Sequence, residues 1–104
     1  MSYYEATLLE EHVLIALDEL ERASGLSIEQ ITELVEYGVF QPEGGRPHEW
    51  RFAARCIAVG RRANRLHAAF ELSMPGLALT LSLVERIEAL EQELSAMRAQ
   101  ALRE

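Results

Sequence analysis

The spacing of hydrophobic and polar positions changes along the chain and separates an extended start from a series of helices. The stretch "TLLEEHVLIA" alternates loosely, which predicts an N-terminal strand or extended arm. In "LDELERASG", apolar residues recur at Leu17, Leu20 and Ala23. This helical spacing predicts a short helix that stops at Gly25, because glycine readily adopts the left-handed conformation found after many helices.

The stretch "LSIEQITELVEYG" predicts a second short helix directly afterwards. Ser27 with Gln30 three residues later is the spacing of a capping box, in which each side chain binds the other's backbone N–H. Gly38 is expected to end this helix. Its buried stripe is expected at Ile28, Ile31, Leu34 and Val35. Two short helices joined by a tight turn predict a helix-turn-helix.

A wing-like hairpin is expected next. The segments "VFQ" and "EWRF" flank "PEGGRPH", a stretch rich in turn-forming residues, so the two segments are predicted to be short paired strands. We interpret Trp50 as a wing-strand residue that closes the hairpin against the following helix. The alternative is that Trp50, with its neighbour Arg51, anchors a partner, since tryptophan and arginine are frequent at interface hot spots.

Two further helices are predicted. From Phe52 to about Leu72, apolar residues recur at helical spacing, with Cys56 among them as a buried, unreactive thiol. The opposite face carries Arg55, Arg61, Arg62 and Arg65. We expect the aliphatic stems of these arginines to lie along the protein surface and their guanidinium groups to pair with acids near the N-terminus. On this interpretation they do not form a phosphate-binding patch. Ser73 and Pro75 then suit the start of a final helix.

The final helix carries a heptad-like apolar seam. Residues spaced alternately four and three apart are Leu83, Ile87, Leu90, Leu94, Met97 and Ala101. The charged residues that flank the seam would pair with residues of opposite charge in both a parallel and an antiparallel dimer. The seam therefore predicts dimerisation but does not predict the relative orientation of the two helices. The other reading is that the stripe packs on its own domain. We therefore divide the chain into a winged helix-turn-helix domain, 1–74, and a C-terminal dimerisation helix, 75–104.

Charge is distributed unevenly. The net charge is −7, all ten basic residues are arginines, and residues 1–45 hold ten acids against Arg22 alone. Residues 46–70 instead hold six arginines against Glu49. Runs of like charge often form nothing more than a solvent-exposed face. The acidic N-terminal part of the chain could also bind a partner that is basic.

No catalytic constellation is recognisable. The three histidines lie in different predicted elements without ligand spacing, so we expect no metal, no cofactor, no small-molecule substrate and no enzymatic activity. No apolar run is long enough to span a membrane, and the acidic start is unlike a signal peptide. We expect a cytoplasmic protein. The pattern as a whole predicts a mainly α fold with a small β wing and a long C-terminal helix.

Three stretches resemble a known family. They are "SGLSIEQITELVEYGVFQP", "EWRF" and "PGLALTLSLVERIEALEQEL", and within the MerR-like winged helix-turn-helix group they are most similar to the chaperone-modulator family CbpM. The resemblance covers about residues 8 to 95. It departs at Met74, where the family pattern has tryptophan. It implies a dimeric, non-catalytic protein that binds the J-domain of the DnaJ-like co-chaperone CbpA and inhibits both its stimulation of DnaK and its other activities.

The charge on the second helix agrees with a protein partner. Glu29, Glu33 and Glu36 are spaced to form one acidic ridge, which would be repelled by DNA phosphates. We expect this ridge, with Asp18 and Glu19, to bind a basic helix of the J-domain. The alternative is a MerR-type DNA-binding regulator that uses Arg46, Arg51 and Arg55. A third possibility is a dimerisation module with no other ligand.

Overall fold

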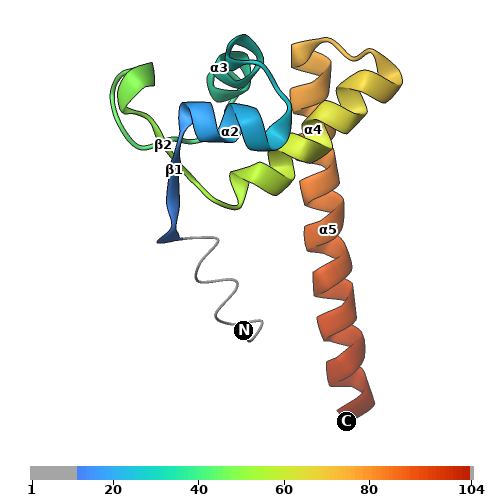
Figure 1. The fold of residues 1–104 in the computed structure, drawn as a ribbon. Coiled ribbons are helices and arrows are strands. Elements are labelled where there is room, and N and C mark those ends of the chain that lie inside the picture. Colours follow the sequence, from blue (N-terminus) through green and yellow to red (C-terminus); the bar gives the residue numbers. More distant parts are fainter. Residues whose placement is uncertain (1–11, 104) are drawn as a thin grey trace.

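The computed structural model describes residues 12–103 and is mainly helical (Figure 1). The elements in chain order are β1 (Leu14–Ala16), α2 (Leu17–Ser24), α3 (Ile28–Glu36), the 3-10 turn η1 (Pro47–Glu49), β2 (Arg51–Ala53), α4 (Cys56–Phe70) and α5 (Met74–Arg103). Helices α2 and α3 form the predicted helix-turn-helix. The predicted arm is a strand from Leu14, and its earlier part lies outside the described residues.

Local signals set the two short helices as predicted. Gly25 ends α2 with φ of 84°, in the left-handed region. Ser27 Oγ accepts a hydrogen bond from the Gln30 backbone N–H at 3.1 Å, while Gln30 Oε1 accepts one from the Ser27 N–H at 2.9 Å. The capping box is therefore complete, and α3 begins where its sequence predicts.

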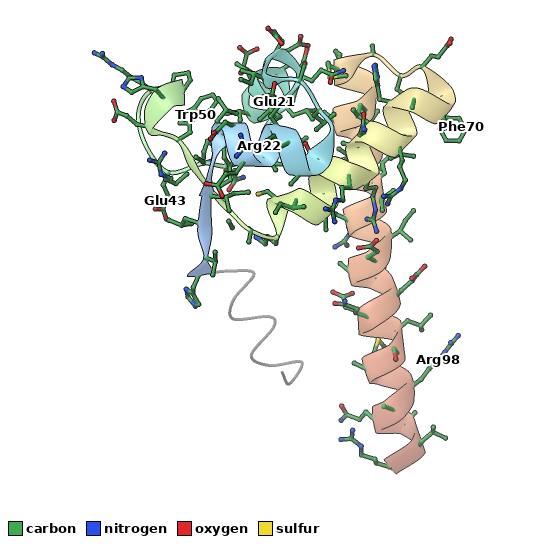
Figure 2. All side chains as sticks on the ribbon, in the orientation of Figure 1. Glu21, Arg22, Glu43, Trp50, Phe70 and Arg98 are labelled. Atoms are coloured by element: carbon green, nitrogen blue, oxygen red, sulfur yellow. The ribbon has the colours of Figure 1, made fainter. Side chains whose placement is uncertain are left out.

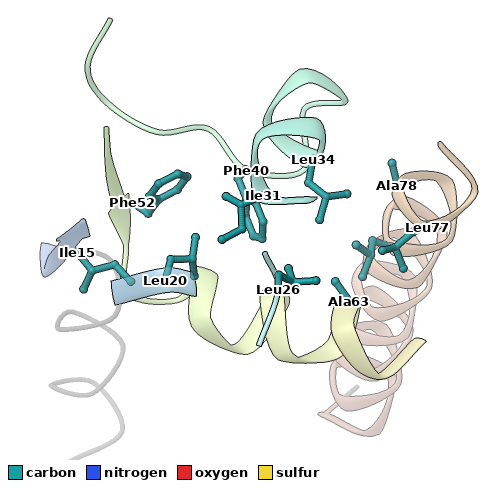
Figure 3. Close-up of a cluster of buried hydrophobic side chains, with 11 residues drawn as sticks. Ile15, Leu20, Leu26, Ile31, Leu34, Phe40, Phe52, Ala63, Leu77 and Ala78 are labelled. Carbon is teal, nitrogen blue, oxygen red and sulfur yellow. The ribbon is translucent and has the colours of Figure 1, made fainter. Parts of the chain in front are cut away.

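The core joins the helix-turn-helix to both long helices. Figure 3 shows its buried side chains, which come from both strands, from α2, α3 and α4 and from the start of α5. The fully buried large residues are Leu20, Leu26, Ile31, Leu34, Phe40, Phe52 and Leu77. One predicted member is wrong: Ile28 is 39% exposed, because the first residue of α3 lies at the edge of the contact with α2.

The wing differs from the predicted hairpin. Strand β2 pairs with β1 in antiparallel register, with Ile15 opposite Phe52, and the segment "VFQ" is not a strand. A single bridge between Glu43 and Arg51 closes the loop. The prediction failed because Phe40 is drawn into the core, where its ring meets that of Phe52 edge to face at 6.0 Å.

Helix α4 begins later than predicted, at Cys56, since Phe52 and Ala53 belong to β2. It packs closely on α2 at Gly60. A Cβ added to Gly60 would lie 2.7 Å from Ser24 Cβ, so only glycine allows this approach. The missing side chain at Gly60 thus lets the backbones of α2 and α4 lie in direct contact.

Helix α5 is the predicted long C-terminal helix. Ser73 Oγ accepts the Gly76 N–H at 3.2 Å and so caps its start, as expected. Leu77, Ala78 and Leu81 enter the core, whereas the later part extends away from the other elements (Figure 1). The division of the chain at residues 74 and 75 stays a prediction.

Candidate protein-interaction surface

The acidic ridge, Glu29, Glu33 and Glu36, lies on the face of α3 that points away from the core. All three side chains are exposed, while Ile31 and Leu34 on the opposite face are fully buried. Within residues 12–103 no ion pair engages any of the three carboxylates. The ridge is therefore a solvent-facing row of uncompensated negative charge, at the position where a helix-turn-helix presents its second helix.

Asp18 and Glu19 are also exposed, but both have internal partners. Asp18 Oδ2 accepts a hydrogen bond from Arg22 Nη1 at 3.3 Å, one turn later on α2. Glu19 Oε1 accepts the Ala16 backbone N–H at 3.2 Å and thereby caps α2. Asp18 and Glu19 therefore offer less unpaired negative charge to a partner than the ridge on α3 does. Asp18 is paired with Arg22, and Glu19 caps α2.

Trp50 is partly buried at the core edge, and its ring meets Phe52 edge to face at 6.0 Å. Figure 2 shows it beside the loop that carries η1. Arg51 is exposed and its Nη1 donates to the Trp50 carbonyl at 2.8 Å. Both predicted roles of Trp50 stay predictions, since a partly buried indole can both pack and contact a partner.

Within residues 12–103 none of the arginines at 55, 61, 62 and 65 forms an ion pair with an acid of α2 or α3. Arg62 Nη1 instead binds Glu88 Oε1 of α5 at 2.8 Å. Arg61 Nε donates to the Ala23 carbonyl at 2.9 Å, near the end of α2. The acids before residue 12 lie outside the described residues, so pairing with them stays a prediction.

The thiol of Cys56 is partly buried at the start of α4. Burial raises its pKa above the ordinary value, and the opposing effects of nearby Arg55 and the Ala53 backbone are smaller. A raised pKa lowers the thiolate fraction at neutral pH, which suits a packing role. Within residues 12–103 no three histidine, cysteine or acidic side chains are grouped to hold a metal ion.

The predicted seam residues lie in the free part of α5. Leu83, Ile87, Leu90, Leu94 and Met97 are between 45% and 69% exposed. They occupy the face opposite Leu77 and Leu81, which pack in the core. The apolar stripe therefore does not fold back onto its own chain.

Sequence reasoning missed two shallow hollows that share Glu85. The first, about 130 Å³, lies between the end of α3 and α5 and is bordered by Tyr37. The second, about 310 Å³, lies along residues 38–41 and is bordered by Arg55 and Cys56. No sequence signal indicates either hollow, because each is formed by residues of elements distant in the chain.

None of the helices in the described part of the chain is long and apolar enough to cross a membrane.

Comparison with known proteins identifies close relatives. The family model described as MerR HTH family regulatory protein matches residues 7–99. The protein named chaperone modulatory protein CbpM of Coxiella burnetii (strain Dugway 5J108-111) is 36% identical over 90 residues, covering 86% of this chain and 85% of that protein. Proteins of the same name from Pseudomonas putida (strain W619) and Pseudomonas entomophila (strain L48) are 32% and 34% identical over 88 residues, covering 83% of this chain and 87% of each.

Proposed function

The chain belongs to the MerR HTH family and, within it, to the chaperone modulatory proteins CbpM, and we propose that it binds the J-domain of a DnaJ-like co-chaperone of the CbpA type. Family membership supports a chaperone-modulating, regulatory role. In the proposed mechanism the bound protein covers the J-domain surface that stimulates DnaK, so the co-chaperone is inhibited without any chemical step.

The acidic ridge on α3 carries this proposal. Glu29, Glu33 and Glu36 form an exposed row without internal cations, on a helix held rigidly by its capping box and its core contacts. A basic helix placed along this row would gain several complementary charge pairs at once, which raises the association rate and fixes orientation. Duplex DNA would instead bring phosphates against carboxylates.

The proposed test removes the ridge charges. We expect the variant E29A/E33A/E36A to bind the J-domain about tenfold more weakly at low ionic strength, since exposed pairs contribute roughly 0.3–1 kcal/mol each. The dependence of affinity on salt should also fall. Isothermal titration calorimetry at two salt concentrations measures both.

A matched control separates ridge charge from total charge. The double variants E29A/E33A and E43A/E49A each lose two exposed carboxylates, but only the first pair lies on α3. The loop pair should leave the affinity close to that of the unaltered protein. Equal losses for both pairs, or no binding by the unaltered protein, would contradict the proposal.

A DNA-binding regulator is the competing function. The three arginines proposed for it are exposed, but Arg51 lies against Glu43 through the backbone bridge, and Glu49 occupies the same loop as Arg46. The positive charge there is therefore mixed with acids. We expect no retarded complex with random duplex DNA in a gel shift at low salt, and a salt-sensitive complex would favour the DNA reading.

A homodimer formed through α5 completes the proposal. Exposure of the seam residues supports it, because a soluble helix that exposes a continuous leucine-rich stripe is stabilised by a partner helix. Either helix orientation leaves the acidic ridges outside the seam, since each domain packs on the opposite face of its own α5.

A further inference from the structure

The hollow between α3 and α5 continues the acidic ridge. Its volume of about 130 Å³ is several times the roughly 30 Å³ that one liquid water occupies. Val39, Ala78, Leu81 and Ser82 lie at its lining, and Tyr37 and Glu85 border it. Ala78 and Leu81 are almost completely buried and form its floor. Tyr37 follows Glu36 directly, so the hollow opens at the point where the ridge ends.

The electrostatics of this hollow favour a cation. The negative end of the α3 dipole lies here, and the last turn of α3 has no basic residue. Glu85 forms no ion pair within residues 12–103. Arg55 borders the neighbouring hollow that shares Glu85, yet it does not pair with it. Backbone N–H groups of residues 37–40 bind the last carbonyls of α3. The Glu85 carboxylate is therefore the group at this hollow that lacks an ion-pair partner among the described residues.

We propose that this hollow receives one arginine or lysine side chain of the partner that docks on the acidic ridge. The proposal rests on the proposed function and adds a specific anchor to it. The aliphatic stem of the incoming residue lies beside the half-exposed Tyr37 ring, and its charged end lies near Glu85. Long basic side chains fit because they combine an apolar stem with a charged end.

Two variants test the hollow without disturbing the core. Glu85→Gln removes the charge and keeps the shape, and Ser82→Arg places an internal guanidinium one turn from Glu85 on the same helix. We expect each to weaken J-domain binding about five- to tenfold by calorimetry. Glu85→Gln removes the charge that binds the incoming residue, and the arginine of Ser82→Arg occupies that charge first. Glu49→Gln is the control for loss of one exposed carboxylate and should change affinity less than twofold.

A double-mutant cycle identifies the incoming residue. Each exposed arginine or lysine of the J-domain is changed to glutamine and measured against the unaltered chain and against Glu85→Gln. Coupling of about fivefold to one basic residue supports the anchor.

The outcomes distinguish the two proposals. If the unaltered protein binds the J-domain but Glu85→Gln and Glu49→Gln behave alike, the anchor is wrong while the proposed function stands. Absence of coupling to every basic residue leads to the same conclusion. If the unaltered protein does not bind the J-domain at all, the proposed function itself fails, and the anchor fails with it.

Discussion

The two halves of α5 carry similar apolar residues in different surroundings. In the first half, Leu77 and Leu81 lie in the core beside α3 and α4, and both are almost completely buried. In the second half, Leu90 and Leu94 recur at the same helical spacing but are nearly half exposed. Within residues 12–103, the last salt bridge between α5 and the domain is the 2.8 Å pair between Arg62 and Glu88.

This difference separates folding from association. Burial of a leucine side chain stabilises the folded state by about 2 kcal/mol. The core leucines of the first half are buried by contacts within one chain. The second half has no internal partner, and a single helix of this length is marginal in water. Substitutions at the buried positions of the first half should therefore change the free energy of unfolding, whereas those at the exposed seam positions should change self-association.

The largest effect is expected at Leu77. Leu77→Ala should lower the free energy of unfolding by about 3 kcal/mol, since it leaves a cavity in the core. Urea denaturation followed by circular dichroism measures the loss. Leu79→Ala is the matched control on the same turn, 62% exposed, and should cost less than about 1 kcal/mol at low protein concentration. Similar losses at both positions would show that α5 is not anchored as described.

A charge in the seam should act on association. We expect Leu90→Asp to weaken self-association at least about 30-fold, because each helix would bury an aspartate in an apolar interface, a cost of roughly 2 kcal/mol or more. Analytical ultracentrifugation across a concentration series measures it. Gln92→Asp places the same charge on the opposite face of the helix and should leave association unchanged. A monomeric unaltered protein at high concentration would rule out the dimer.

The smallest effect is expected at the junction of the halves. The Arg62–Glu88 pair is about half exposed, so a double-mutant cycle with Arg62→Gln and Glu88→Gln should give a coupling of about 0.5 kcal/mol that falls with added salt. Thermal unfolding at two salt concentrations measures it. A coupling above roughly 2 kcal/mol would mean that the junction, rather than the core leucines, holds α5 in place.

The sequence predicts those parts of the fold that depend on neighbouring residues. The capping box of Ser27 and Gln30, the stop at Gly25 and the start of α5 at Ser73 are confirmed. Each depends on contacts within one helical turn, so spacing alone identifies it. The exposed ridge on α3 follows from the same helical periodicity, although its role in binding stays a prediction.

The parts that the sequence could not predict depend on distant contacts. β2 pairs with β1 instead of with residues 39–41, because Phe40 and Phe52 pack together in the core. Arg62 reaches Glu88, 26 residues later, a pairing that no local spacing indicates. The hollow beside Tyr37 and Glu85 likewise exists only once α3 lies against α5. No local pattern encodes any of these three.

The orientation of the buried and exposed faces of α5 has a consequence for valency. Because the core and the seam lie on opposite sides of the helix, pairing through the seam would leave both ridges available, two binding sites per assembly. In a parallel pair the two sites would lie at the same end. In an antiparallel pair they would be separated by nearly the length of α5, which is 30 residues or about 45 Å. That spacing would decide whether one dimeric partner is held by both sites, with the gain in avidity this brings, or whether two partners are bridged.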